Sequence, residues 1–385
     1  MNNIISYIDE FGDKSFDKMP FNEVDSLILC QMSYLNFRSF VPGIEDYNKS
    51  VSIQDILLEN RMDDLLEGYW FKNENRKLFT KAAKSVRFGD MKMCFFTEIF
   101  NEEHDTQFCA ITFILGDKSI YFAFRGTDST LIGWKEDLKL AYSEPIRSQK
   151  LAAEYVDTAS THFAGKFRMG GHSKGGNLAV YAAMFCKKDT RRRILEVFDH
   201  DGPGFRPEIL REGHFEILKG KIHKYIPKSS IVGILLESTM EYEVIESRSI
   251  GAMQHNTYFW KSKDGKFIRS KGMTRIKKTT DAALNEWIYS LSDDEVSTFV
   301  DALFDVLTAS DAKTLFELAK NPQKSVLSFF SAYKEMDKST KEAIFSIIRK
   351  LVEGMSEKTF EEFLGKKEPL GDIAEDPKQE SWEEA

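Results

Sequence analysis

Long hydrophobic runs, an excess of basic charge and closely spaced cysteines are all missing from this sequence of 385 residues. No window approaches eighteen consecutive apolar residues, so we expect no transmembrane segment. The first residues, MNNIISYIDEFGDKSF, carry acids where a signal peptide needs a basic start followed by an apolar run. Together these features predict a cytoplasmic chain.

The charge balance argues against nucleic acid as a partner. The sequence has 53 basic and 61 acidic residues, a net charge of −8, and its last twenty residues contribute −4 through seven acids and three lysines. The remainder is nearly neutral, so it lacks the basic field on which nucleic-acid binding depends. We expect residues 367–385 to form an acidic, disordered tail.

Cysteines are few and scattered, at Cys30, Cys94, Cys109 and Cys186. None belongs to a C-x-x-C motif or a Cys/His cluster, so we expect buried, reduced thiols, no metal site and no cofactor. Apolar residues, in contrast, make up 42% of the chain and include 31 phenylalanines. That much apolar surface can offset the entropy of ordering, and the chain is predicted to fold.

The hydrophobic period divides the chain into three stretches. A helical period over residues 21–83 predicts an N-terminal helical layer. Between 91 and 271, short β-rich runs alternate with helical stretches, which indicates an α/β architecture with a mostly parallel sheet. The helical period returns over 279–364, where a capping box of Ser292 and Glu295 precedes an apolar face.

From these stretches we predict an α/β domain over residues 1–275 and an all-α C-terminal region over 276–366. The strand candidates are Met91–Phe100, Gln107–Leu115, Ser119–Arg125, Phe167–Gly170, Leu195–Phe198, Ile222–Ile226, Tyr242–Glu246 and Lys266–Arg269. The helix candidates between them are Trp134–Ala141, Gln149–Phe163, Lys174–Cys186 and Ile231–Leu236. Further helices are predicted from Ala312, Pro322 and Ser339.

The run Gly171-His172-Ser173-Lys174-Gly175 is a G-x-S-x-G pattern between a strand candidate and a helix candidate. A nucleophile elbow needs this context, because its sharp strand-to-helix turn lifts the serine Oγ above the sheet and the flanking glycines relieve crowding. Ser173 is therefore the candidate nucleophile. The alternative is a glycine-rich turn whose serine only caps a helix.

The upstream run Phe124-Arg125-Gly126-Thr127 ends a strand candidate of its own. A serine hydrolase of this type needs two donors for the developing oxyanion, one after the nucleophile and one in an upstream strand-end loop. We assign these roles to the Lys174 N–H and to Thr127, although Thr127 alone would suit an ordinary turn. The Lys174 ammonium is expected to be solvated.

Seven histidines are available as the general base: His104, His162, His172, His200, His214, His223 and His255. The first precedes the catalytic strands, the second lies within a helix candidate and the third sits in the elbow. His255 follows the strand candidate Tyr242–Glu246 in a loop, where the hydrolase order of serine, acid and histidine places its base. We favour His255, the alternative being a surface-loop histidine, and expect His223 to be an orienting or buried strand residue.

The orienting carboxylate stays open between three residues. Asp199 and Asp201 belong to the run Asp199-His200-Asp201-Gly202-Pro203-Gly204, at the carboxyl end of a strand candidate. The next such end offers no acid until Glu237. We favour Asp201, for which the alternative is an Asx-turn carboxylate.

These residues resemble known families. FRGT, followed by Trp134 and Asp137 and then by GHSKGG, resembles the fungal-type class 3 lipases. Over residues 1–310, the opening FNEVDSLILCQMSYLNF, the DGPGF turn, SSIVGILLES and QHNTYFW look like a bacterial α/β-hydrolase family of unknown function.

The resemblance implies an α/β-hydrolase fold, with Ser173 as nucleophile, Thr127 at the oxyanion hole and His255 as base. One departure concerns the acid, because class 3 lipases carry an aspartate where this sequence has Ser229-Ser230. That departure points to the aspartate of the DGPG turn, a placement that resembles pancreatic-type lipases.

Two functions follow from this pattern. The first is a serine hydrolase of small-molecule or lipid carboxylic esters, in which Ser173, His255 and Asp201 act through an acyl-enzyme and residues 231–236 line an acyl site or form an ordinary core helix. The second is a weak or inactive hydrolase-fold protein that binds a partner through its C-terminal helices. Peptidase activity would use the same site as the first.

Overall fold

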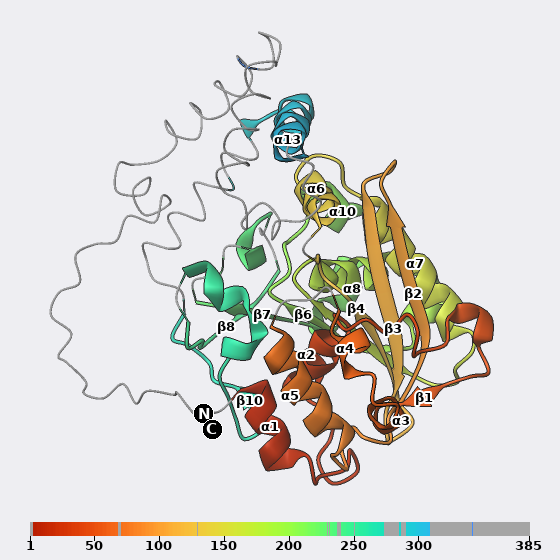
Figure 1. The fold of residues 1–385 in the computed structure, drawn as a ribbon. Coiled ribbons are helices and arrows are strands. Elements are labelled where there is room, and N and C mark those ends of the chain that lie inside the picture. Colours follow the sequence, from red (N-terminus) through yellow and green to blue (C-terminus); the bar gives the residue numbers. More distant parts are fainter. Residues whose placement is uncertain are drawn as a thin grey trace, which may run out of the picture.

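The computed structural model describes residues 3–67, 71–128, 130–228, 230, 232–236, 240–249, 251–272, 285, 290–308 and 341. It is a mixed α/β structure around one eight-stranded sheet, whose strand order follows the chain from β1 to β8 (Figure 1). Neighbours from β1 to β4 are antiparallel, and neighbours from β4 to β8 are parallel. The prediction of an α/β fold with a mostly parallel sheet is therefore confirmed.

The strands are β1 Val51–Ser52, β2 Lys92–Asn101, β3 Thr106–Ile114, β4 Ile120–Phe124, β5 Phe167–His172, β6 Ile194–His200, β7 Ile222–Pro227 and β8 Glu243–Ile245. A hairpin of β9 Ser262–Lys263 and β10 Lys266–Phe267 stands apart from the sheet. The helices before β2 are α1 Ile4–Phe11, α2 Glu23–Met32, α3 Ile53–Leu58, α4 Met62–Leu65 and α5 Lys72–Ala83. The later ones are α6 Leu131–Lys139, α7 Arg147–Ser160, α8 Lys174–Phe185, α9 Lys188–Arg191, α10 Pro207–Glu212, α11 Phe215–Leu218 and α13 Asp293–Thr308.

The sequential strand order determines which segments cover each face. Parallel crossovers are right-handed, so crossovers that always step to the next strand in one direction place their helices on one face. Accordingly α7, α8, α10 and α11 share one apolar core with residues of β2 to β6. The other face is left for segments from outside the crossovers.

The N-terminal helices cover that second face. Residues of α1, α2, α3 and α5 form the other large core, together with Tyr258, Trp260 and Phe267 from the end of the sheet domain. Figure 1 shows these helices, in red and orange, on a different side of the strands from α7 and α8. A fully buried ion pair between Arg87 and Asp25, with Nη2 and Oδ2 2.5 Å apart, ties the layer together.

Helix α6 differs from the predicted range Trp134–Ala141 by starting three residues earlier. Thr130 caps its start by accepting a hydrogen bond from the Gly133 N–H at 3.2 Å. Gly133 lies inside this helix, and a side chain there would clash, because a Cβ would come within 2.4 Å of Gln107 Oε1 and 2.8 Å of Thr127 Cγ2. Close packing of α6 therefore explains why this helical position is a glycine.

The capping box predicted at the start of the C-terminal region is present. Ser292 Oγ accepts from the Glu295 N–H at 3.2 Å, and Glu295 accepts from the Ser292 N–H at 2.9 Å. Helix α13 follows directly. The predicted domain boundary at 275, the helices from Ala312, Pro322 and Ser339, and the tail over 367–385 lie outside the described residues, apart from Lys341.

Two further expectations concern the cysteines and membrane-spanning helices. All four cysteines are buried and carry free thiols. Within the described ranges, no helix has both the length and the apolar character that a membrane span requires.

Candidate active site

The candidate residues meet at the carboxyl edge of the parallel strands. Thr127 follows β4, Ser173 follows β5, Asp201 follows β6 and Ser230 follows β7. His255 lies beyond β8, in the short helical turn Gly251–His255. Loops at this edge converge because parallel strands all end there.

Ser173 occupies the sharp turn between β5 and α8, with φ 59° and ψ −135°. This left-handed φ is uncommon for a residue with a side chain and indicates a strained turn. The two glycines of the pattern are required by contact, since a Cβ on Gly171 would lie 2.1 Å from Gly175 and one on Gly175 would lie 2.2 Å from Phe124 O. The geometry of the turn thus depends on its own glycines and on close contact with the end of β4.

His255 contacts the fully buried Asp201, with 2.6 Å between Nδ1 and Oδ2. Because a carboxylate only accepts, Nδ1 carries the proton and Nε2 is the basic nitrogen. The other oxygen of Asp201 accepts a short hydrogen bond from Ser230 Oγ, which itself accepts from the Gly233 N–H at 2.9 Å. Ser230 therefore fixes the carboxylate, a role that the sequence pattern did not indicate.

Asp199, one of the alternative acids, lies elsewhere. It is fully buried, its Oδ1 accepts from the Gly202 N–H at 2.8 Å, and its Oδ2 lies 3.4 Å from Lys224 Nζ. The structure brings Asp201, rather than Asp199, to His255. The third alternative, Glu237, lies outside the described residues.

The predicted oxyanion donors flank Ser173. Among the described residues, no acceptor takes the backbone N–H of Thr127 or of Lys174. The Thr127 hydroxyl donates to Asp137 Oδ2 at 2.5 Å, so its side chain is fixed and the backbone N–H is the available donor. The other oxygen of Asp137 lies 3.4 Å from Lys174 Nζ, so one carboxylate contacts both donor residues.

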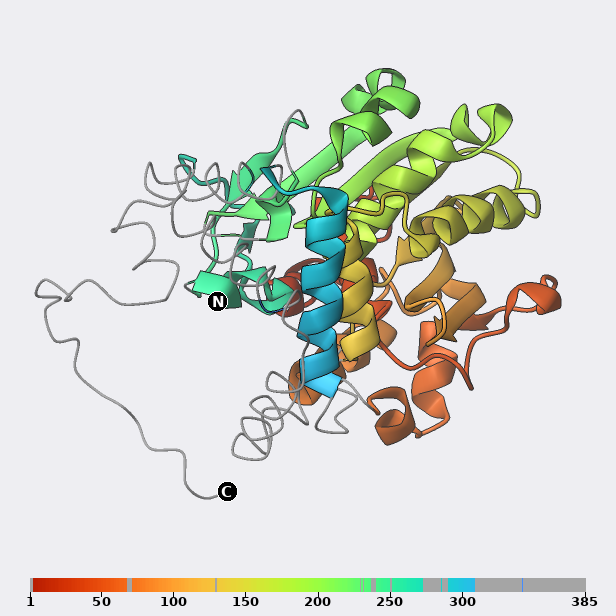
Figure 2. The same ribbon diagram turned by 90° about the horizontal axis from the view of Figure 1, so that it is seen from above.

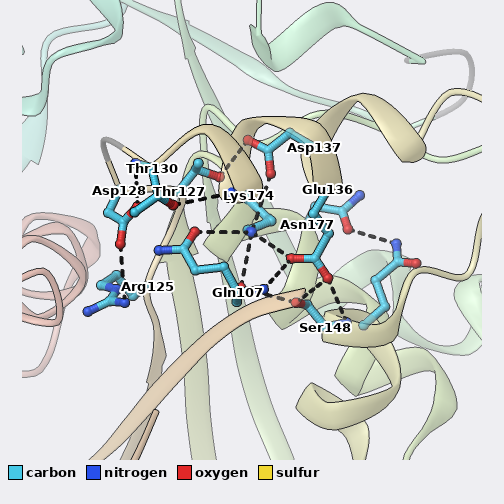
Figure 3. A network of polar contacts seen from close by, with 12 residues as sticks. Gln107, Arg125, Thr127, Asp128, Thr130, Glu136, Asp137, Ser148, Lys174 and Asn177 are labelled. Carbon is cyan, nitrogen blue, oxygen red and sulfur yellow. Dashed lines mark hydrogen bonds and ion pairs between the residues drawn. The ribbon is translucent and has the colours of Figure 1, made fainter. Parts of the chain in front are cut away.

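The expectation that the Lys174 ammonium is solvated is wrong, because the side chain is only 1% exposed. Its Nζ lies 3.0 Å from Glu136 Oε2 and donates to Gln107 O at 3.1 Å (Figure 3). Burial disfavours the ammonium, but the charges of Asp137 and Glu136 outweigh it and raise the pKa of Lys174. The G-x-S-x-G pattern gives no sign of this cluster, because the two acids that contact Lys174 come from α6, far away in the sequence.

Glu136 is the centre of the network in Figure 3. Besides Lys174, it accepts from the Gln107 N–H at 3.0 Å and from Ser148 Oγ at 2.6 Å. The network therefore joins β3, α6, α7 and the start of α8 beneath the Thr127 loop.

His172 lies between the elbow and the His255 loop. Its Nε2 is 2.8 Å from His255 O, its Nδ1 is 3.1 Å from the Tyr34 hydroxyl, and the two imidazole rings are 4.5 Å apart. Because a carbonyl only accepts, the proton is on Nε2. Burial and the neighbouring His255 lower the pKa of His172 well below its ordinary value, so this ring stays neutral.

The other histidines are not at this site. His200 is buried and its Nε2 lies 2.8 Å from Ser26 Oγ on α2. His223 lies in β7 and its Nε2 is 3.4 Å from Glu196 Oε1, so it orients neither Ser173 nor His255. His162 contacts the rings of Tyr47 and Phe95.

A cavity of about 510 Å³ opens at these residues, and Ser173, His255, Thr127 and Lys174 all line it. Its apolar lining comes from Tyr34, Phe71, Trp134, Leu138, Leu140, Ala141, Pro203, Val232, Leu235, Leu236 and Met253. Within the described contacts, no hydrogen bond joins Ser173 to the His255 ring. Within the predicted helix Ile231–Leu236, the structure has a 3₁₀ turn over Val232–Ile234; Val232 and Leu235 line the cavity, and Ile234 is buried in a small core with Ile226.

A family model described as Mbeg1-like matches residues 82–305, more than half of the chain. The chain belongs to the Mbeg1-like family. This is a lipase-like family. The matched residues include Thr127, Ser173, Asp201 and His255. Comparison with curated proteins and with solved structures finds no match.

Proposed function

We propose that this Mbeg1-like protein is a serine hydrolase of carboxylic esters, with an α/β-hydrolase fold and an active site similar to that of class 3 lipases. The observation that carries the proposal is the 2.6 Å contact between His255 Nδ1 and Asp201 Oδ2 at a cavity that Ser173 also lines. The strained backbone of Ser173 and the two available amides beside it support the same assignment.

In the proposed reaction, Ser173 Oγ attacks the acyl carbonyl carbon while His255 Nε2 takes the serine proton. The carbonyl oxygen becomes an oxyanion and accepts from the Thr127 and Lys174 backbone N–H groups. The bond to the alcohol oxygen then breaks, and the alcohol leaves with the proton from His255. Water, deprotonated by His255, attacks the acyl-enzyme, and the acid leaves as Ser173 regains its proton.

The apolar lining of the cavity supports an acyl group as the part of the substrate that is bound there. Apolar walls favour burial of a hydrocarbon by about 25 cal/mol per Å². The absence of a direct Ser173–His255 hydrogen bond is compatible with this mechanism, because such bonds often tighten only when substrate is bound.

The decisive experiment compares the wild-type protein with Ser173→Ala. We expect a fluorophosphonate probe to label only the wild type, and short-chain nitrophenyl esters to be hydrolysed only by it. If the wild type is not labelled and hydrolyses the esters no faster than Ser173→Ala does, the protein is a binding or scaffold module instead. A peptide substrate assayed in parallel separates esterase from peptidase activity.

The acid is tested by amide substitutions. Asp201→Asn should lower kcat by about 10⁴-fold, as loss of the tautomer-holding carboxylate does in serine proteases. Asp199→Asn is the matched control, because it makes the same change two residues away in a side chain held by Gly202 and Lys224. A large loss of kcat in Asp199→Asn or Glu237→Gln, with Asp201→Asn active, would reassign the acid.

A further inference from the structure

Two short segments form much of the apolar lining of the cavity and are called its two walls here. Helix α6 and the residues just after it supply Trp134, Leu138 and Leu140, and the segment 232–236 supplies Val232 and Leu235. The walls meet where Leu140 and Leu236 pack in one buried cluster. The second wall contains only a 3₁₀ turn of three residues, so its position depends on contacts from elsewhere in the chain.

Asn285 supplies such contacts. Its Nδ2 donates to Ile234 O at 2.8 Å, and its Oδ1 accepts from the Leu236 N–H at 3.0 Å. A single side chain about fifty residues further along thus pairs two backbone groups of the wall. An unpaired buried backbone group is unfavourable, so this amide holds the turn in place.

Helix α13 supports the other wall. Val296, Val300 and Phe304 pack with Leu131 in a buried cluster on α6. Asp301 adds an ion pair to Lys135, with Oδ1 and Nζ 3.1 Å apart. Figure 2 shows α13, in blue, lying alongside the yellow α6.

We propose that Asn285 and helix α13 together brace these two walls of the cavity and so determine which acyl groups it accepts. This inference rests on the proposed function. An apolar pocket distinguishes acyl groups by about 10- to 200-fold per methylene, and only when its walls stay in place. In this view, Asn285 and α13 influence which substrate the cavity binds, and the strand-end loops carry the groups that react with it.

The test uses one variant for each wall, Asn285→Ala and Phe304→Ala. We measure kcat/KM for a series of straight-chain nitrophenyl esters from acetyl to palmitoyl. The ratio between the best ester and the acetyl ester should fall by about 10-fold or more in both variants. Labelling of Ser173 by a small fluorophosphonate should stay within about 3-fold of wild type, because the contacts of α6 with Thr127 and Lys174 are made by Gly133, Glu136 and Asp137, which neither variant changes.

Two control variants separate bracing from general loosening. Thr298→Ala changes the exposed face of α13, and Leu218→Ala opens the core at α11, away from the cavity lining. Both should keep the wild-type ester profile. An unchanged profile in Asn285→Ala and Phe304→Ala, or an equal flattening in Leu218→Ala, would overturn the inference.

A second measurement works without catalysis. Straight-chain acids of the same lengths are used to displace an apolar fluorescent dye from the Ser173→Ala protein and from its double variants with Asn285→Ala and Phe304→Ala. Loss of length selectivity in the double variants supports the brace, and unchanged selectivity contradicts it. Failure of the proposed function is a distinct result, namely a wild-type protein that neither reacts with the fluorophosphonate nor hydrolyses any ester.

Discussion

His172 precedes the proposed nucleophile Ser173 in the sequence, and its imidazole links two loops of the site. It donates to the carbonyl of His255 and accepts from Tyr34, a residue just beyond α2. Because its low pKa keeps it neutral, it positions the His255 loop without adding a charge beside the base. We regard it as a positioning residue.

A pair of amide variants tests this role. In His172→Gln the side-chain amide reaches the place of Nε2 and can still donate to His255 O, whereas the shorter amide of His172→Asn cannot. We expect His172→Asn to lower kcat by about 3- to 10-fold, the equivalent of one neutral hydrogen bond, and His172→Gln to recover most of it. Steady-state kinetics over the pH range of the assay measure both, and equal losses in the two variants would contradict the assignment.

The backbone and the side chain of Lys174 have separate roles. The backbone N–H is a proposed oxyanion donor, while the ammonium neutralises Glu136 and Asp137 in the interior. Removing one partner of a buried ion pair leaves an uncompensated charge.

Lys174→Met should therefore lower the free energy of unfolding by about 3–5 kcal/mol, measured by urea denaturation. The matched control is Lys228→Met, whose partly exposed pair with Glu246 should change stability by about 1 kcal/mol or less. A loss for Lys174→Met as small as that of the control would favour the solvated ammonium expected from the sequence.

The identities of Ser173 and His255 as candidates could be inferred from sequence because an elbow and a strand-order rule specify them. Asp201 was favoured as the partner of His255, but the other residues that hold the site could not be inferred. Ser230, Tyr34 and Glu136 come from segments whose proximity follows from the fold, and each is an ordinary residue in its own local sequence.

At the scale of elements, α6 connects the oxyanion loop to the cavity wall. Gly133 allows the helix to pack directly against Thr127 and Gln107. The helix range predicted from the sequence begins at Trp134, just after this glycine, and glycine disfavours helix interiors by about 1 kcal/mol relative to alanine. Tertiary contact outweighs that preference here.

Gly133→Ala should lower kcat even though alanine is the better helix former. The added Cβ would displace α6 or Thr127 and so misplace one oxyanion donor, a loss of about 10²- to 10³-fold in comparable enzymes. Gly220→Ala is the control, because a Cβ at Gly220 meets nothing within 4 Å. Steady-state assays of both variants provide the check, and unchanged kcat in Gly133→Ala would show that the donor tolerates the shift.

At the scale of the whole molecule, two layers cover the sheet and bury histidines that cannot easily take up a proton. Burial lowers the pKa of His200 to about 3 and that of His172 well below its ordinary value. In the unfolded chain a histidine has a pKa of about 6.5. Between these values the unfolded state binds protons that the folded state does not.

The free energy of unfolding should therefore fall as the pH drops from about 6.5 toward 3, by up to about 1.4 kcal/mol per pH unit for His200. His200→Gln should flatten this slope, while the exposed His214→Gln should leave it unchanged. Urea denaturation at a series of pH values measures the slope. A slope in His200→Gln equal to that of wild type would show that His200 does not contribute to acid unfolding.

The α/β pattern, the glycine-rich turn around Ser173 and the capped start of α13 could all be predicted from the sequence. These features depend on residues close together in the chain, such as glycines two positions from a serine or a Glu three positions after a Ser. Local steric and hydrogen-bonding rules are therefore enough to predict them.

The sequence left open which carboxylate faces His255, and the folded structure answers it. Asp199 and Asp201 are two residues apart, and regular strand alternation would place both on the same face. The left-handed backbone at Asp201, with φ 58°, breaks that alternation and turns its side chain toward His255, while Asp199 stays with Lys224. The same holds for the bracing of the cavity by Asn285 and α13, because contacts between distant segments depend on the path of the whole chain.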